Sequence, residues 1–321
     1  MKFTQHWPCS LVRPLRHRSI LQPRSVGRWQ LQQLVGTGVW SRVYRAAAHP
    51  WRPGDPQAVA VKLLRWRWHR RPEAWELFRR EAQLGMAISH PHLAAVLEVG
   101  LNTPPRYLVL EWLDGEPLAD LIEQRGPLDW RWAVHAARQL AEALDAVHRS
   151  GWRHADVKPA NVLVSPAGNA TLTDLGLAQP IDAARGSNLP LAGTPSYLAP
   201  ELLGSGGAID GRTDLYALGV LLYECLVGHV PFAGGSLLEL ARLHREQPPI
   251  DVCQVRTELP AQVSTIVNRL LAKRPEQRPQ SAREAAELLA GCLPQLGPLR
   301  AADVARWHRA TGAEHSLRAS A

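Results

Sequence analysis

Three short strings of residues constrain this chain more than any other feature of its sequence. They are His154-Ala155-Asp156-Val157-Lys158-Pro159-Ala160-Asn161, then Asp174-Leu175-Gly176, then Ala199-Pro200-Glu201. Two further strings precede them, GTGVWSRV at residues 36–43 and VAVK at residues 59–62. One such match is weak evidence by itself, whereas five in a fixed order over about half of the chain point to one fold and one chemistry.

Together these strings resemble the signature of protein kinases, and most closely that of the eukaryotic-like Ser/Thr kinases of bacteria. The resemblance covers residues 29–292. It implies an α+β, two-lobed protein-kinase fold, with a small β-rich N-lobe that has one helix (29–113) and a larger α-helical C-lobe (114–292). It also implies a protein serine/threonine kinase that uses ATP and Mg²⁺, with Mn²⁺ as a substitute, on protein substrates.

Hydrophobic spacing along the chain predicts the same division into two lobes. Before Asp114-Gly115, short apolar or alternating runs predict five strands, and only residues 72–88 have a helical pattern. The run 215–230 is strongly apolar but carries Glu224 and His229, so we expect a buried core helix and no membrane span. Further helices are expected at 128–150, 213–228, 237–246, 261–272 and 281–290.

Charge is unevenly placed in this chain, whose formal net charge is +8. Residues 1–28 contain six cations and no acid, which predicts a basic, disordered arm; a transit peptide has the same composition. The alternative hypothesis is that the arm binds an anionic partner. Nucleic acid is not the favoured partner. Residues 293–321 read as a tail. The four scattered cysteines have no metal-binding spacing, and they predict a reduced, cytoplasmic protein.

The resemblance implies roles for the groups that handle charge and protons. Asp156 is the expected catalytic base, or the orienting acceptor, for the substrate hydroxyl. Lys158 would contact the transferred phosphate, and Thr194 would hydrogen-bond to both residues. Lys62 would bind the α- and β-phosphates, held in place by Glu81 nineteen residues later.

Metal and nucleotide ligands follow from the same resemblance. Asn161 and Asp174 offer oxygen atoms, which Mg²⁺ prefers, and would bind the metal. Gly36 and Gly38 lack a Cβ, so the backbone there can approach phosphates closely. For the ribose, the sequence does not choose between Asp114 and Glu116. The expected nucleotide-binding set, including the adenine sandwich, the gatekeeper and the hinge, is Gly36, Thr37, Gly38, Val43, Ala60, Lys62, Leu110, Glu111, Leu113 and Leu163.

Three positions depart from the family pattern. Ser41 replaces a glycine of the phosphate loop, and Leu175 replaces a phenylalanine with little change in packing. Ala155 stands where the family commonly has an arginine that pairs with a phosphate on the activation loop, which puts that mode of control in doubt. The resemblance also implies two structural roles, a buried Glu201–Arg278 ion pair and an Asp214 carboxylate that holds the catalytic-loop backbone.

Two rival functions and one unexplained segment remain open from sequence. A pseudokinase would keep the fold as a binding module without catalysis, and a small-molecule kinase would act on another substrate class. The Ala199-Pro200-Glu201 string and Thr194 favour a protein substrate. The basic and aromatic segment at residues 65–71, RWRWHRR, either packs its tryptophans on the small lobe or binds an anionic surface.

Overall fold

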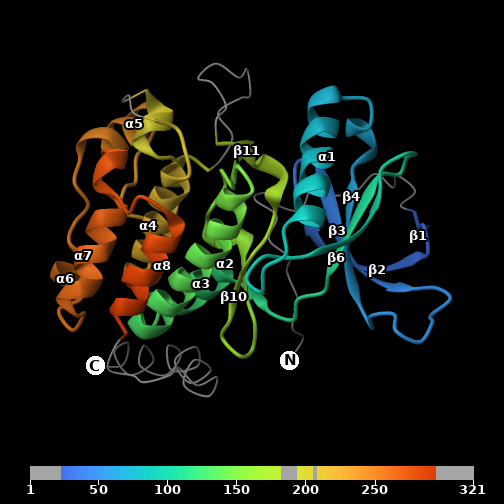
Figure 1. The fold of residues 1–321 in the computed structure, drawn as a ribbon, viewed down its shortest axis with the longest axis horizontal. Coiled ribbons are helices and arrows are strands. Elements are labelled where there is room, and N and C mark those ends of the chain that lie inside the picture. The colour runs from blue at the N-terminus through green and yellow to red at the C-terminus, as the bar shows by residue number, and fades with distance from the viewer. Residues whose placement is uncertain (1–22, 182–193, 205–207, 294–321) are drawn as a thin grey trace.

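The computed structural model describes residues 23–181, 194–204 and 208–293, which form two lobes (Figure 1). The N-lobe is built on a six-stranded antiparallel sheet in the order β1-β2-β3-β4-β6-β5. Its elements are β1 (Ser25–Val26), β2 (Trp29–Thr37), β3 (Ser41–Ala48), β4 (Val59–Leu64), the 3₁₀ turn η1 (Trp66–Trp68), α1 (Pro72–Ala87), β5 (Val96–Gly100) and β6 (Tyr107–Glu111).

Strand β4 is covered on both faces of the sheet, which explains its continuous apolar sequence. All six of its residues are buried. On one face, Ala60 and Leu64 share a cluster with Phe78 and Ala82 of α1. On the other face, a second cluster contains Val59 and Val61. Lys62 therefore projects from a strand that is held rigidly from both sides.

The C-lobe surrounds α4 (Arg212–Val227), almost all of which is buried. Helices α3 (Trp130–Arg149), α7 (Ala261–Leu270) and α8 (Ala282–Gly291) contribute to the same core. Helix α4 ends at Gly228, whose φ of 88° is the left-handed conformation that favours glycine. The other helices of the described C-lobe are α2 (Leu118–Arg125), α5 (Leu237–Glu246) and α6 (Val252–Val255).

Short strands between the lobes position the chemistry-bearing loops. Strand β9 (Val162–Val164) pairs with β10 (Ala170–Leu172) and with β7 (Glu116–Pro117), and β8 (Trp152–Arg153) pairs with β11 (Gln179–Pro180). The first string of the sequence begins where β8 ends, and Asp174 comes two residues after β10. Both loops thus leave the C-lobe on the side that faces α1 and β4.

The predicted fold class is confirmed: an α+β, two-lobed arrangement with one α-helix in the described N-lobe. The start of that lobe differs from the sequence expectation, because residues 25–28 form strand β1 and the turn that joins it to β2, and not a disordered arm. Gly27, at φ 52°, turns the chain so that Val26 pairs with Trp29, and both side chains become buried. The short helices α2 and α6 were not expected. The remaining domain limits stay predictions.

The apolar run at residues 215–230 forms the buried helix α4, as expected. In the parts of the chain that the structure describes, no helix has both the length and the apolar character needed to cross a membrane.

Candidate active site

Asp156 lies in the loop between β8 and β9, and two neighbours fix its carboxylate. The Lys158 ammonium donates to Asp156 Oδ1 at 2.9 Å and lies 2.7 Å from Oδ2. The Asn161 amide donates to Asp156 Oδ2 at 2.7 Å and to the Asp156 carbonyl at 2.8 Å. Burial raises the pKa of Asp156, while the charge of Lys158 opposes that rise. The loop thus presents a preorganised carboxylate at the rim of the cleft.

The backbone of this loop is held from below by Asp214 at the start of α4. Its carboxylate accepts hydrogen bonds from the backbone N–H groups of His154 at 2.7 Å and Ala155 at 2.9 Å. Burial alone would raise the pKa of Asp214, but the hydrogen bond from His148 and these N–H donors keep it below its usual value. Ala155 has φ 64°, a left-handed conformation uncommon for alanine, and the Asp214 contact holds it there.

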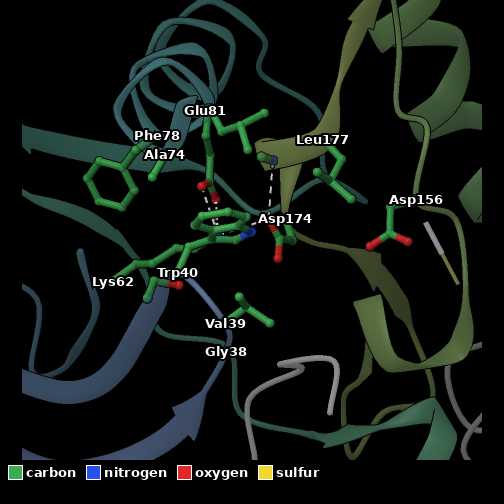
Figure 2. Close-up of a pocket in the computed structure, with 13 residues that line it drawn as sticks. Gly38, Val39, Trp40, Lys62, Ala74, Phe78, Glu81, Asp156, Asp174 and Leu177 are labelled. Atoms are coloured by element: carbon green, nitrogen blue, oxygen red, sulfur yellow. Dashed lines mark hydrogen bonds and ion pairs between the residues drawn. The ribbon is translucent and has the colours of Figure 1, made fainter. Parts of the chain in front are cut away.

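Lys62 forms the charged centre on the N-lobe side of the cleft. Its ammonium donates to both carboxylate oxygens of Glu81 at 2.7 and 2.8 Å, and to Asp174 Oδ1 at 2.8 Å (Figure 2). Burial lowers the pKa of Lys62, but the two carboxylates outweigh it and the net direction is upward. Burial raises the pKa of Glu81 to about 7, against the pull of Lys62.

Asp174 follows β10 in a left-handed conformation with φ 68°. Its Oδ1 also accepts the backbone N–H of Gly176 at 3.1 Å. A Cβ at Gly176 would lie 3.0 Å from that same oxygen, so a side chain there would press on the Asp174 carboxylate. Burial would raise the pKa of Asp174, but Lys62 and the Gly176 N–H lower it overall. Asp174 is therefore an ionised carboxylate at the mouth of the cleft.

The donor set at this point fits a hard divalent cation. Asn161 Oδ1 is buried without a hydrogen-bond partner in the described residues, although the amide nitrogen of the same side chain is fully engaged. Asp174 uses only Oδ1 in its recorded bonds. No group of three His, Cys, Asp or Glu side chains within the described ranges could hold a metal alone. A cation held by one amide, one carboxylate and nucleotide phosphates is the usual arrangement for Mg²⁺.

The apolar residues expected around adenine come together between the lobes. Val43, Ala60, Leu110 and Leu163 are buried in one cluster, and Leu113 packs against it. Glu111 ends β6, and its side chain accepts the backbone N–H of Ala95 at 2.9 Å. An apolar surface of this kind is suited to contact with a flat aromatic ring.

The glycine-rich turn between β2 and β3 is closed onto the cleft. Gly36 and Thr37 pair with Val43 and Arg42, and Gly38 donates to the Ser41 carbonyl at 2.9 Å. Figure 2 shows Trp40, from the tip of this turn, among the residues that line the hollow, together with Lys62 and Asp174. The hollow measures about 100 Å³, and the indole of Trp40 forms part of the same wall as the charged groups.

The segment at residues 65–68 holds this turn through hydrogen bonds and ring packing. The sequence did not predict these contacts. Arg65 Nη1 donates to the Gly38 carbonyl at 2.9 Å, and Trp68 Nε1 donates to the Val39 carbonyl at 2.8 Å. The rings of Trp40 and Trp68 lie 4.3 Å apart between centroids. The packing hypothesis therefore holds for Trp68, whereas Trp66 is 70% exposed.

Thr194 meets the catalytic loop through Lys158. Its Oγ1 accepts from the Lys158 ammonium at 3.0 Å. The expected second bond, to Asp156, is absent among the described residues, because the Lys158 ammonium lies between the two oxygen groups. Glu201 and Arg278 form a fork at 2.7 and 2.8 Å, as the resemblance implied.

His154, for which the sequence predicted no role, is fully buried. Its Nδ1 accepts the backbone N–H of Asp156 at 3.3 Å, and its Nε2 lies 3.2 Å from the Thr173 carbonyl. The ring thus joins the Asp156 loop to the Asp174 loop. Its place two residues before Asp156, at the head of the first string, is the signal that could have identified it.

Comparison with known proteins agrees with this geometry. The family model described as "Protein kinase domain" matches residues 29–289. A probable serine/threonine-protein kinase of Clostridium perfringens, CPE1738, is 34% identical over 80% of this chain and 37% of its own. Two serine/threonine-protein kinases of Mycobacterium tuberculosis are each 36% identical: PknB over 80% of this chain and 41% of its own, and PknA over 82% and 61%.

The fold and the site therefore define a protein kinase domain, and the chain belongs to the protein kinase family. Its relatives are bacterial serine/threonine-protein kinases, which confirms the resemblance to the eukaryotic-like branch. The chain spans less than two thirds of the length of each of these relatives.

Proposed function

We propose that this protein is an ATP-dependent protein serine/threonine kinase. The observation that carries the proposal is the Asp156 carboxylate, fixed by Lys158 and Asn161 in the same cleft as the Lys62–Glu81–Asp174 cluster. Phosphoryl transfer asks little covalent chemistry of the protein; it needs positioned charge and an oriented nucleophile. This cleft supplies both.

Each group has a distinct task in the proposed reaction. Asp156 accepts the hydrogen bond, and then the proton, of the substrate hydroxyl that attacks the γ-phosphorus atom. Lys158 stabilises the charge on the transferred phosphoryl group, and Thr194 holds the Lys158 ammonium on its other side. Lys62 binds the α- and β-phosphates, and Glu81 restricts its long side chain. Gly36, Thr37 and Gly38 cover the phosphates from above.

The proposed metal is Mg²⁺, with Mn²⁺ as a substitute. Asn161 Oδ1 and Asp174 would hold it, and when bound it would neutralise charge on the phosphates. Val43, Ala60, Leu110 and Leu163 would enclose the adenine, with backbone groups of Glu111 and Leu113 at its edge. Since the hollow that Trp40 lines measures only about 100 Å³, we expect the glycine-rich turn to move outward when nucleotide binds.

A protein substrate is supported by the surface next to the catalytic loop. A hollow of about 460 Å³ adjoins Lys158 and Thr194 and extends to α2 and α4, including Glu123 and Glu224. An extended peptide could lie there with its hydroxyl at Asp156. A pseudokinase would tolerate loss of one or more of the charged groups. All five are present in this chain: Lys62 contacts Glu81 and Asp174, and Asp156 contacts Asn161.

A reducing, cytoplasmic location is part of the proposal. The support is the scattered spacing of the four cysteines in the sequence, which suits a reducing compartment. The anionic partner proposed for the basic arm concerns residues that lie mostly outside the described part of the chain.

The test is to incubate the purified protein with γ-labelled ATP and Mg²⁺ and to map the labelled residues. We expect phosphoserine or phosphothreonine on protein, and no label with Asp156→Asn. Label that passes to an added small molecule and not to protein would favour a small-molecule substrate, and nucleotide binding without turnover would favour the pseudokinase. Mainly phosphotyrosine would contradict the assigned specificity.

A further inference from the structure

A second hollow lies on the face of the N-lobe sheet that is turned away from the catalytic groups. It measures about 520 Å³ and is walled by β3, β4 and the segment that follows β4 (Figure 1 shows both strands). Side chains alternate along β3: Val43 belongs to the nucleotide face, whereas Arg42 and Tyr44 line this hollow. Its volume falls within the range of small-ligand sites, about 300–1,000 Å³.

The wall of this hollow carries unbalanced positive charge. Arg42, Arg65 and Arg67 line it, and no Asp or Glu does. Within the described ranges, none of the three has a carboxylate at ion-pair distance, although most other arginines of the protein do. Burial, together with repulsion from Arg67 and Arg42, lowers the pKa of Arg65. Three guanidinium groups held this close together are stabilised by an added anion.

The three arginines leave most of their N–H donors without a hydrogen-bond partner among the described residues. The Nε group of Arg42 is buried without a partner among the described residues. Arg65 reaches the glycine-rich turn only through Nη1, and Arg67 only through Nη2, at 3.4 Å from the Val39 carbonyl. A guanidinium presents five N–H donors in a planar fork, so each arginine keeps donors for a ligand.

Apart from His69, the rest of the lining is apolar and aromatic. Leu63 and Tyr44 belong to the hydrophobic cluster on this face of the sheet, and they form part of the wall of the hollow. Trp66 stands at the wall with 70% of its surface exposed. An occupant that matches this lining combines a multivalent anion with an adjacent apolar group.

We propose that this hollow binds a phosphorylated peptide of a partner protein, with a phosphoserine or phosphothreonine on the three arginines and an apolar neighbour against Trp66 and Leu63. Planar guanidinium forks match phosphate oxygens in pairs, and arginine clusters are a recurrent means of reading phosphorylated side chains. Residues 1–22 of this chain contain four cations and no acid, so the occupant is not that segment. A nucleic-acid strand needs a long groove with successive stacking platforms, whereas this is one concave hollow with one exposed indole.

The test is a binding measurement without ATP, so that no phosphate is transferred. The probe is a fluorescent peptide with one phosphothreonine flanked by leucines, and its anisotropy is compared with that of the same peptide carrying threonine. We expect the phosphopeptide to bind at least about tenfold more tightly. Arg42→Gln and Trp66→Ala should each weaken it by about fivefold or more, since each removes one part of the recognition. Arg70→Gln, a matched change at an exposed arginine outside the hollow, should leave binding unchanged.

Three results would overturn the proposal. They are equal affinity for the two peptides, unchanged affinity in Arg42→Gln, and tighter binding of a single-stranded RNA oligonucleotide than of the phosphopeptide. Arg42→Lys keeps the charge but loses the fork, so it should recover only part of the affinity if the proposed geometry is right. Trp66 is exposed, and Trp66→Ala therefore keeps the test interpretable should Arg42→Gln unfold.

Discussion

Two buried ion pairs, one in each lobe, have almost the same length but different surroundings. Lys62 and Glu81 lie 2.7 Å apart beside the cleft, and Arg278 and Glu201 lie 2.7 Å apart inside the C-lobe. Arg278 and Glu201 have no exposed side-chain surface, and Arg278 also donates to the carbonyls of Arg212, Lys273 and Ala272. Lys62 instead divides its donors between Glu81 and Asp174, whose side chain is 31% exposed.

The difference separates a pair that stabilises the fold from one that is available for chemistry. In the C-lobe, each donor and acceptor has a protein partner, and Thr213 adds a hydrogen bond to Glu201. Beside the cleft, the charge of Lys62 is shared, and burial brings the pKa of Glu81 to about 7. An ammonium that shares its donors with a partly exposed carboxylate can exchange that partner for a phosphate with little reorganisation.

The substitution Lys62→Met gives the strongest test of this difference between the two ion pairs. We expect a loss of roughly a thousandfold in phosphoryl transfer, because the phosphates lose their cation. The protein should stay folded, with a change in unfolding free energy of about 1 kcal/mol, since Glu81 can take up a proton when its partner is gone. Activity is measured with labelled ATP and stability by denaturant titration.

The decrease in unfolding free energy caused by Lys62→Met should be larger at higher pH. Glu81 has a folded-state pKa above its ordinary value, so the folded protein binds the extra proton, and stability falls as pH rises through that window. The destabilisation should therefore be larger at about pH 8 than at about pH 6. A variant that is unfolded at both pH values would show that this pair is structural after all.

Arg278→Met should have the opposite outcome, a loss of stability before any question of chemistry. It leaves the Glu201 carboxylate buried without a cation and three backbone carbonyls without their donor. Removing one partner of such a pair costs about 3–5 kcal/mol. Denaturant titration beside the exposed control Arg274→Met measures it. Equal stability of the two variants would contradict the contrast between the pairs.

The sequence predicted the contacts between residues of the family motifs, and it did not predict the contacts made by residues outside them. The Lys62–Glu81 and Glu201–Arg278 contacts, and the hold of Asp214 on the loop backbone, join residues whose spacing is part of the family pattern. The hydrogen bonds from Arg65 and Trp68 to the glycine-rich turn could not be predicted, because they depend on how that turn lies over a segment that no motif describes. The strand β1 was missed because two residues are too few to show a period.

His244 is a buried side chain of the C-lobe whose hydrogen bonding, unlike that of Arg278 and Glu201, is incomplete. His244 is buried between Tyr216 and Phe232; its Nδ1 bonds to the Tyr216 hydroxyl at 2.9 Å, and its Nε2 has no partner in the described residues. Burial, with repulsion from Lys273, lowers the pKa of His244 to about 4. An unfolded chain binds this proton near its ordinary pKa of about 6.5, so folded stability is lost as pH falls from that value toward 4.

We therefore expect His244→Gln to flatten part of the acid side of the stability profile. The contribution that disappears can reach about 3 kcal/mol at the acid end of the window. Unfolding is followed by denaturant titration at several pH values, with the exposed His49→Gln as the matched control. A His244→Gln profile parallel to that of the parent protein would assign the acid sensitivity to other groups.

The smallest expected effect concerns Ser187, which lies outside the described residues. Ala155 stands where the family commonly has the arginine that pairs with an activation-loop phosphate, so a phosphate on Ser187 would lack that fork. The catalytic loop already has internal supports, since Asp214 and His154 hold its backbone and Lys158 joins it to Thr194. Ser187→Ala and phosphatase-treated protein should therefore differ from the parent by less than about threefold in turnover, because few charge-assisted bonds are lost. A hundredfold loss in either would mean that the cleft, unlike the C-lobe pair, depends on a phosphate for its order.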